Sequence, residues 1–386
     1  MHLRTIRSIL RLNGKRVLVR CDLNASITNG SLGADDLWKL KSVIPTIRYL
    51  RRKKARIILV SHRGRPKGYD HDLTLAPIVK KLSSLLGVTI PLWHSDFDTY
   101  EKRSKELKPG AIGCLENIRF NHGEERNDER LGRSLARLAD IYVDDAFGNI
   151  HRTHASMVAV TRFLPSYAGL LVQYEVEHLQ GLLQRARHPI VAVIGGNKIS
   201  TKILLIKKLL RRVDWVLLGG ALANTVLAAM DYKIGRSIVE EDMRSWSKSI
   251  LHNKLKVPLD ARVAPSIQSS AARYAAIGAV RDKEMILDLG PDTIAFYASI
   301  LKLAKTVVWN GPVGYFEDQR FAVGTKELVK VLTHIKAKAY VGGGETVKAV
   351  LEENAEDKVR FISTGGGAML SLLEGRPLPA LRALQK

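Results

Sequence analysis

The chain has 386 residues, of which 46% are hydrophobic and 26% are charged, a composition typical of a globular protein with more than one core. No apolar run reaches the roughly 18 residues that a membrane span needs, and two cysteines are too few for a disulfide framework. The sequence therefore argues against a membrane anchor and a disulfide-rich secreted scaffold, and it favours the cytoplasm, where thiols stay reduced.

The balance of charge is strongly basic. Lys and Arg total 61 against 38 Asp and Glu, which gives a formal net charge of +23. Such an excess attracts nucleotides, phosphorylated metabolites and nucleic acid alike, and a solubility preference spread over the surface explains it equally well. Segment 1–16 is basic and free of acids, as in a transit peptide, but it runs directly into a strand pattern. We therefore interpret it as part of the fold.

The first half of the chain alternates apolar, strand-like runs with segments of helix length. The strand-like runs lie at 16–23, 57–60, 88–93, 112–119 and 141–145, and the helix-length segments at 37–52, 75–86 and 129–139. This βαβ alternation predicts a parallel sheet with helices on both faces and with ligands bound beyond the carboxyl ends of its strands.

Basic and polar side chains follow these strand-like runs. They are Arg20, Asp22, Asn24, His62, Arg63, Arg65, Arg119, His151, Arg152 and His154. Because the carboxyl ends of parallel strands share one edge, we expect the arginines to converge there and to bind a small ligand bearing phosphate and carboxylate. Any one arginine is explained as well by an ion pair or a surface position. His151 and His154 lack the further ligands of a zinc site.

In the second half the strand-like runs end in glycine. These glycines are Gly195 and Gly196, Gly219 and Gly220, Gly311, Gly342 to Gly344, and Gly365 to Gly367. Such turns let a flat base and a phosphate chain approach the backbone, so the pattern predicts nucleotide binding. After Gly196 we predict a helix on which Lys198 and Lys202, four residues apart, share a face. Tight turns that serve packing alone remain the alternative.

The connection between the halves has no Gly/Ser linker. Segment 174–183 has a helix pattern instead, so we expect a helical hinge. A basic, anion-binding half together with a nucleotide-binding half predicts phosphoryl transfer across an interdomain cleft.

Eight motifs, in order and spacing, resemble those of the phosphoglycerate kinase family over nearly the whole chain. They are Arg20 to Asn24, Ser61 to Pro66, Leu115 to Phe120 with Gly123 to Glu125, Asp145 to Gly148 with His151 to Ser156, Gly195 to Lys202, Trp309 to Pro312 with Gly314 and Glu317, Gly342 to Thr346, and Ser363 to Gly367. The resemblance implies two doubly wound, Rossmann-like parallel-sheet domains. Residues 1–170, with 368–386 returning to them, would bind 3-phosphoglycerate, and residues 171–367 would bind the nucleotide.

The resemblance also implies a function and a set of site residues. The activity would be reversible phosphoryl transfer between 1,3-bisphosphoglycerate with ADP and 3-phosphoglycerate with ATP, in glycolysis and gluconeogenesis, by a cytoplasmic monomer that uses Mg²⁺. The catalytic residues would be Arg20, Lys198 and Lys202, and the 3-phosphoglycerate ligands Asp22, Asn24, Lys39, His62, Arg65, Arg119, Arg152 and His154. The nucleotide ligands would be Gly195, Gly196, Lys198, Lys202, Gly219, Gly220, Asn310, Glu317, Gly342, Gly343, Gly344, Glu345 and Thr346, with Glu345 also binding the metal.

Five positions depart from the family pattern. Lys39 replaces an arginine, Ser26 a proline, Thr201 a frequent Asp, Glu345 the metal-binding Asp, and Asp144 a frequent Asn. Together with the net charge of +23, which is its main support, these departures leave an alternative hypothesis: a kinase-like protein with weakened catalysis whose basic surface binds RNA, DNA or a nucleoprotein. The position of the positive charge separates the two, because a nucleic-acid binder needs a continuous basic patch outside the substrate site.

Overall fold

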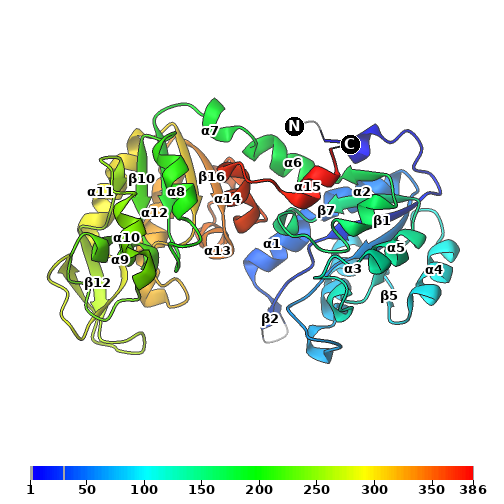
Figure 1. Cartoon of the computed structure of the whole chain (residues 1–386), viewed down its shortest axis with the longest axis horizontal. Coiled ribbons are helices and arrows are strands. Elements are labelled where there is room, and N and C mark those ends of the chain that lie inside the picture. The colour runs from blue at the N-terminus through cyan, green and yellow to red at the C-terminus, as the bar shows by residue number, and fades with distance from the viewer. Residues whose placement is uncertain (1–2, 29–30, 386) are drawn as a thin grey trace. The chain divides into compact units, whose positions relative to one another are not determined.

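The structure, a computed structural model, describes residues 3–28 and 31–385 and divides into two compact units (Figure 1). Unit 1 comprises Met1–Gln180 and Arg376–Lys386, and unit 2 comprises Gly181–Gly375. The boundaries between the units lie later in the chain than residues 170 and 367, where the sequence analysis placed them. The reason is that helix α6 (Leu170–Leu179) packs on unit 1 and helix α14 (Gly366–Glu374) packs on unit 2.

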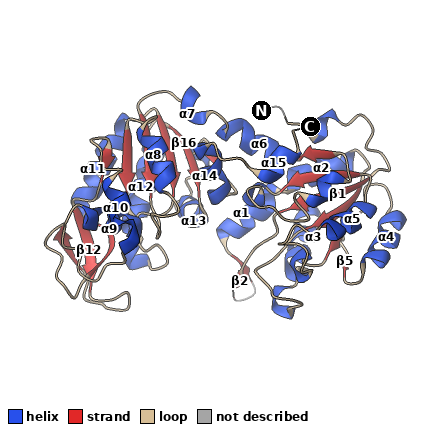
Figure 2. Ribbon diagram, in the orientation of Figure 1, coloured by secondary structure: helices blue, strands red, loops and turns tan. Residues whose placement is uncertain are grey.

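Unit 1 is built on a central sheet covered by helices (Figure 2). The sheet has six parallel strands in the order β5-β6-β4-β1-β7-β8. Its strands are β1 (Arg16–Cys21), β4 (Arg56–Val60), β5 (Leu92–Trp93), β6 (Ile112–Leu115), β7 (Ile141–Asp145) and β8 (Ser166–Ala168), and a hairpin is formed by β2 (Ile27–Thr28) and β3 (Ser31–Leu32). Besides α6, its helices are α1 (Ala34–Ser42), α2 (Ile44–Arg52), α3 (Ala76–Leu86), α4 (Phe97–Glu106), α5 (Glu129–Arg137) and α15 (Pro379–Ala383). The central strand β1 lies between β4 and β7, in register at Val17 with Ile57 and Ile141.

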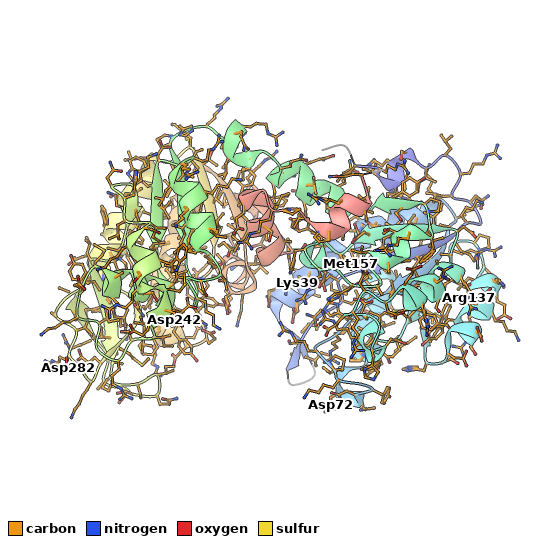
Figure 3. The ribbon with its side chains drawn as sticks, in the orientation of Figure 1. Lys39, Asp72, Arg137, Met157, Asp242 and Asp282 are labelled. Atoms are coloured by element: carbon orange, nitrogen blue, oxygen red, sulfur yellow. The ribbon has the colours of Figure 1, made fainter. Side chains whose placement is uncertain are left out.

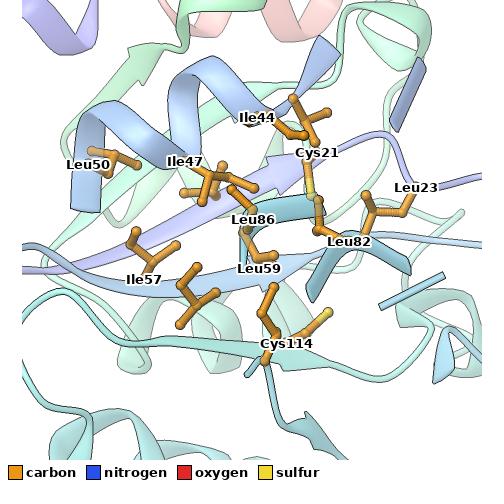
Figure 4. Packing of buried hydrophobic residues seen from close by; sticks show 14 of the residues in the cluster. Cys21, Leu23, Ile44, Ile47, Leu50, Ile57, Leu59, Leu82, Leu86 and Cys114 are labelled. Atoms are coloured by element: carbon orange, nitrogen blue, oxygen red, sulfur yellow. The ribbon is translucent and has the colours of Figure 1, made fainter. Parts of the chain in front are cut away.

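The core of unit 1 joins helix and strand residues on one face of the sheet. Ile47 and Leu50 of α2 belong to the same buried cluster as Ile57 and Leu59 of β4 (Figure 4). Ile6 and Leu12 are buried in this cluster too, which confirms that the basic N-terminal segment is part of the fold. The single helix expected over 37–52 is instead two helices, because Pro45 lacks the N–H that a continuous helix would need and stands in the first turn of α2.

Unit 2 is built on a second six-stranded parallel sheet, of order β11-β10-β9-β15-β16-β17. Its strands are β9 (Ile190–Ile194), β10 (Trp215–Leu218), β11 (Leu255–Lys256), β15 (Thr306–Asn310), β16 (Lys338–Gly342) and β17 (Phe361–Ile362). Besides α14, its helices are α7 (Leu182–Arg185), α8 (Ile203–Leu210), α9 (Gly220–Ala229), α10 (Arg244–Lys248), α11 (Pro291–Leu303), α12 (Val323–His334) and α13 (Gly344–Glu352). The predicted fold class, two doubly wound parallel-sheet domains, is confirmed.

Two features of unit 2 differ from the expectations. A three-stranded antiparallel sheet of β12 (Asp260–Ala264), β13 (Arg273–Ala276) and β14 (Met285–Leu289) was not predicted. The helix expected over 174–183 is interrupted, because Gly181 adopts a left-handed conformation with φ of 66° and separates α6 from α7. Among the helices of residues 3–28 and 31–385, none has both the length and the apolarity to cross a bilayer.

Candidate active-site residues of the two units

Arg20 stands near the end of the central strand of unit 1 and is fully buried. Its Nε donates to the Ser156 hydroxyl (3.0 Å), and its Nη2 lies 2.9 Å from His62 Nδ1. Its Nη1 donates to the Cys21 carbonyl. A guanidinium held at three nitrogens keeps one orientation, so its charge is fixed before any ligand arrives.

His62, at the end of β4, is a neutral partner of Arg20. Burial lowers its pKa well below the usual value, and the positive charges of Arg20, Arg119, Arg152 and His154 add to the effect. Because a guanidinium only donates, Nδ1 of His62 accepts and its proton resides on Nε2. That proton is available to an acceptor atom of a ligand.

Arg119 and Arg152 bring further buried donors to this edge of the sheet. Arg119 Nη1 donates to the Gly64 carbonyl (2.6 Å), and its Nε lies 3.3 Å from Glu125 Oε1. Burial, followed by the charge of Arg152, lowers the Arg119 pKa to about 10. Within the described residues, Arg119 Nη2 and Arg152 Nε are buried without a hydrogen-bond partner. Unpaired buried donors are costly, so an anionic ligand would stabilise them.

The loops after β1 and β4 are tied together by polar side chains. Asn24 Oδ1 accepts from the Gly64 N–H (2.9 Å), and Asp22 Oδ1 accepts from the Asn24 N–H (3.2 Å). Arg65 follows on the same loop and is exposed. Arg63 does not join this set, because its guanidinium donates to backbone carbonyls of its own loop and of the loop after β1.

Lys39 projects from α1 and is paired within its own helix (Figure 3). Its Nζ lies 3.2 Å from Asp36 Oδ1 and 3.7 Å from Asp35 Oδ2. Burial tends to lower its pKa, but Asp36 and then Asp35 outweigh burial and raise it. The charge of Asp22, in the loop after β1, also raises the pKa of Lys39.

Glu124 and Ser156 position this cluster, although the sequence patterns assigned them no role. Ser156 donates its hydroxyl to Glu124 Oε1 (2.6 Å) and its N–H to Oε2 (2.9 Å). His154 Nδ1 lies 3.7 Å from Glu124 Oε1, and burial followed by the charge of Arg119 lowers its pKa to about 4. Both residues occur inside the quoted motifs, and that position was the only signal available for them.

Lys202 is the central cation at the carboxyl edge of the unit 2 sheet. Its Nζ donates to the Gly195 carbonyl and to Asn310 Oδ1 (3.2 Å), which links the ends of β9 and β15. Burial lowers its pKa to about 8, and Glu345 opposes this shift.

The helix expected to begin near Lys198 begins only at Ile203, so Lys198 and Lys202 do not share a helical face. A turn precedes it, in which the Ile199 carbonyl accepts from the N–H groups of Lys202 and Ile203. Ser200 donates its hydroxyl to Glu240 Oε1 (2.6 Å), and Thr201 donates its hydroxyl to the Lys198 carbonyl (2.9 Å). Lys198 is exposed on this turn.

The glycine turns lie together because the strands that precede them are neighbours in the sheet. A Cβ on Gly195 would lie 1.9 Å from the Pro312 carbonyl oxygen, and Gly311 has φ of 92°, so no side chain fits at either position. Asn310, at the end of β15, is buried, and the Gly311 N–H donates to the Thr346 hydroxyl (2.9 Å). Helices α9 and α13 start at this edge after Gly219 and Gly343. Their first N–H groups therefore favour anions.

A largely apolar cavity adjoins the turns after β9 and β10. It is lined by Asn197, Gly220, Ala221, Ala223, Asn224, Ile238, Pro258, Ile267, Met285, Ile286, Leu287, Asp288, Leu289, Val313, Gly314 and Tyr315. Apolar walls with a few polar groups suit a nucleotide base. Most of these residues lie outside the glycine motifs, so no sequence pattern marked them. Glu317 and Glu345 are exposed near this edge.

The fold and the site residues are those of an α/β phosphotransferase, with buried basic side chains at one sheet edge and glycine turns at the other. The sequence profile described as phosphoglycerate kinase matches residues 6–376. A phosphoglycerate kinase from Roseiflexus sp. (strain RS-1) is 43% identical over 392 residues, covering 99% of this chain and 98% of that protein. A cytosolic phosphoglycerate kinase from Triticum aestivum is 42% identical, covering 97% and 96%.

Solved structures agree. Phosphoglycerate kinase from Pyrococcus horikoshii OT3 has a TM-score of 0.89 and 31% identity, covering 99% of this chain and 98% of that one. The enzyme from Coxiella burnetii has a TM-score of 0.84 and 37% identity, covering 99% of both chains. The chain belongs to the phosphoglycerate kinase family. The predicted activity, phosphoryl transfer by a kinase of this family, is confirmed, and the comparisons give no support to the alternative of a weakened, nucleic-acid-binding paralogue.

Proposed function

We propose that the carboxyl edge of the unit 1 sheet binds 3-phosphoglycerate and that the carboxyl edge of the unit 2 sheet binds ATP or ADP. The observation that carries this proposal is the group of buried guanidinium donors in unit 1 that lack acceptors, on Arg119 and Arg152. In the forward direction a carboxylate oxygen of 3-phosphoglycerate attacks the terminal phosphorus of ATP, and ADP leaves with the electron pair of the broken P–O bond. The product is 1,3-bisphosphoglycerate.

The acceptor would be held by charge-assisted hydrogen bonds. Arg119, Arg152 and the Nε2 proton of His62 bind its phosphate and carboxylate oxygens, and Arg65, His154, Asp22, Asn24 and Lys39 complete the set. Arg20, already fixed by Ser156, stabilises the negative charge on the equatorial oxygens during transfer.

The nucleotide would lie across the glycine turns. Its base occupies the apolar cavity, Glu317 binds the ribose, and Asn310, Thr346 and backbone N–H groups at Gly195, Gly196, Gly219, Gly220, Gly342, Gly343 and Gly344 bind the phosphates. Lys198 and Lys202 contact the transferring group. Since burial lowers the pKa of Lys202, a phosphate beside it raises that pKa again and gains a strong, poorly screened interaction.

Glu345 fits a role in Mg²⁺ binding. It is exposed in the first turn of α13, and its charge acts on Lys202. No cluster of three or more Asp, Glu, His or Cys able to hold a metal occurs in the described ranges, which suits an ion held by one carboxylate and by nucleotide phosphates. When bound, Mg²⁺ would neutralise phosphate charge. We further propose that the protein acts in the cytoplasm as a monomer and that the two units approach each other for transfer.

The direct test is a coupled assay with purified protein, 3-phosphoglycerate and Mg-ATP, on the wild type and on Lys202→Ala. We expect turnover by the wild type and a loss of kcat on the order of 10²–10³-fold in Lys202→Ala, because the lysine acts on charge that develops in the transition state. Nucleotide Kd, from equilibrium titration, is expected to change far less. Absence of wild-type turnover at saturating substrate would refute the function, and an equal loss in kcat and nucleotide affinity would refute only the role of Lys202.

A further inference from the structure

Unit 1 carries a basic surface that the proposed reaction does not use. It comes from segments 3–15 and 44–55, neither of which contains Asp or Glu. The surface consists of nine residues, Arg4, Arg7, Arg11, Lys15, Arg48, Arg51, Arg52, Lys53 and Lys54. All except the partly buried Arg51 are exposed. We call this set the α2 basic surface.

The two segments lie side by side (Figure 1). The Gly14 N–H donates to the Lys54 carbonyl (2.9 Å), and the Arg56 N–H donates to the Lys15 carbonyl (2.8 Å). Lys15 directly precedes β1, whereas Arg20 lies near the other end of that strand. With a rise of roughly 3.3 Å per residue, the ends of β1 are separated by about 16–20 Å. Lys15 and Lys54 therefore lie at the end of the sheet opposite to Arg20.

The charges of this surface are not neutralised within unit 1. None of the nine lies within 4.0 Å of a carboxylate in residues 3–28 and 31–385. Their neighbour Arg16, in contrast, pairs with Asp140 at 2.8 Å, and Arg137 pairs with Asp98 and Glu101. Cations without carboxylate partners repel one another where they lie close together, and a polyanion that covered them would remove that repulsion.

Three of the arginines surround a hollow. Arg48, Arg51 and Arg52 are spaced at i, i+3 and i+4, which places them on one face of α2. With Pro45 and Leu170 they line an open hollow of about 570 Å³, and no carboxylate lines it. Arg51 Nε donates to the Gly110 carbonyl (3.3 Å), which orients its guanidinium. A guanidinium group can donate two parallel hydrogen bonds to two oxygens of one phosphate, so the hollow suits phosphodiester groups.

We propose that the α2 basic surface binds the phosphate backbone of nucleic acid without sequence preference, while the protein remains an active kinase. A membrane surface fits less well, because Leu10 is the only exposed large apolar side chain among the described residues of these two segments. Ile44, Ile47 and Leu50 of α2 are buried, so α2 has no free apolar face to insert. A polymer, unlike a small anion, engages charges of both segments at once.

The test is fluorescence anisotropy with a short, fluorescein-labelled, mixed-sequence single-stranded RNA over a salt series. The variant combines Arg48→Gln, Arg51→Gln and Arg52→Gln. The slope of log affinity against log salt concentration is expected to be shallower in the variant than in the wild type by roughly 2. Each lost phosphate contact reduces the magnitude of this slope by about 0.7, and three contacts are removed. At low salt the affinity of the variant is expected to fall on the order of tenfold or more.

A matched control removes the same charge from unit 2 through Arg187→Gln, Arg211→Gln and Arg212→Gln, three exposed arginines. It is expected to keep the wild-type slope and affinity. Both variants should retain wild-type kcat/KM, which also shows that they fold. The proposal is overturned by equal loss in the two triple variants, by absence of RNA binding at low salt, or by tighter binding to phosphatidylserine vesicles than to RNA.

Discussion

At the scale of single residues, a buried carboxyl group next to Arg20 affects the stability of unit 1. Asp144 pairs in register with Arg20 across β7 and β1 and is fully buried. Its Oδ1 accepts from the Ala146 N–H (3.0 Å), whereas its Oδ2 has no partner within the described residues. Burial raises its pKa to about 6, and the hydrogen bond from Ala146 and the charge of Arg20 only partly oppose this. The ionised form is therefore a cost to the fold.

We predict that Asp144→Asn stabilises the protein at neutral pH. The folded-state pKa of about 6 lies above the usual 3.8, so the folded state binds the extra proton and stability falls as pH rises from about 4 to 6. A difference of about two pH units corresponds to on the order of 3 kcal/mol. Urea unfolding of the wild type and the variant at pH 4 to 8 measures the free energy of unfolding. The variant should lack the part of its pH dependence that comes from the titration of one carboxyl group. An unchanged pH dependence would show that Asp144 is ionised at no cost.

At the scale of elements, helix α1 holds the most informative departure from the family pattern. Lys39 is a point charge shared with Asp35 and Asp36 of its own helix. We predict that Lys39→Arg lowers the KM for 3-phosphoglycerate roughly two- to fivefold. A guanidinium group has several N–H donors, so it can stay paired with Asp35 or Asp36 and also donate to the ligand. Steady-state kinetics at saturating ATP measures this, with Lys39→Met as the control that loses affinity. An unchanged KM in both variants would show that Lys39 does not contact the substrate.

The secondary elements were predictable where apolar periodicity is strong and local. Strands β1, β4, β7, β9 and β15 follow from their buried runs. The break before Pro45 and the late start of α8 were not predicted, since each depends on local hydrogen bonding: the missing N–H of proline, and the Ser200–Glu240 pair that holds a turn in place of a helix. The antiparallel sheet was missed because its short strands lack the crossover helices that mark a βαβ pattern.

The sequence predicted those residues of the candidate site that lie at the ends of strands. Arg20, His62 and Asn310 lie at such ends, so topology alone brings each to its edge. Ser156 and Glu124 lie in loops. Ser156 accepts a hydrogen bond from Arg20 and donates one to Glu124, and both bonds join residues that are distant in sequence. Asn224 lines the apolar cavity from within α9, with its Oδ1 buried and unpartnered in the described structure. No sequence period marks such a residue, because its role depends on tertiary packing.

At the scale of the whole molecule, each unit has core clusters of its own, and each is proposed to bind one of the two ligands. The core cluster of α2, β1 and β4 consists of unit 1 residues, and the clusters around β12 and α9 consist of unit 2 residues. A ligand that binds one folded unit stabilises that unit by RT ln(1 + [L]/Kd), about 2.7 kcal/mol at 100 times Kd. We expect that stabilisation to stay local, because separate cores favour local opening of one unit at a time.

Hydrogen exchange measured by mass spectrometry tests this assignment of ligands to units. We predict that 3-phosphoglycerate alone slows exchange in β1, β4 and β7 and leaves β9, β10 and β15 unchanged, and that ATP alone has the opposite effect. Glycerol 3-phosphate, which lacks the carboxylate, is the control and should protect unit 1 less, because fewer of its oxygens meet the guanidinium groups. Protection of β1 and β4 by ATP alone would contradict the assignment. Equal protection of both sheets by either ligand would show that the two units unfold as one cooperative body. Only in that case would slowed exchange in one unit report a ligand bound to the other unit.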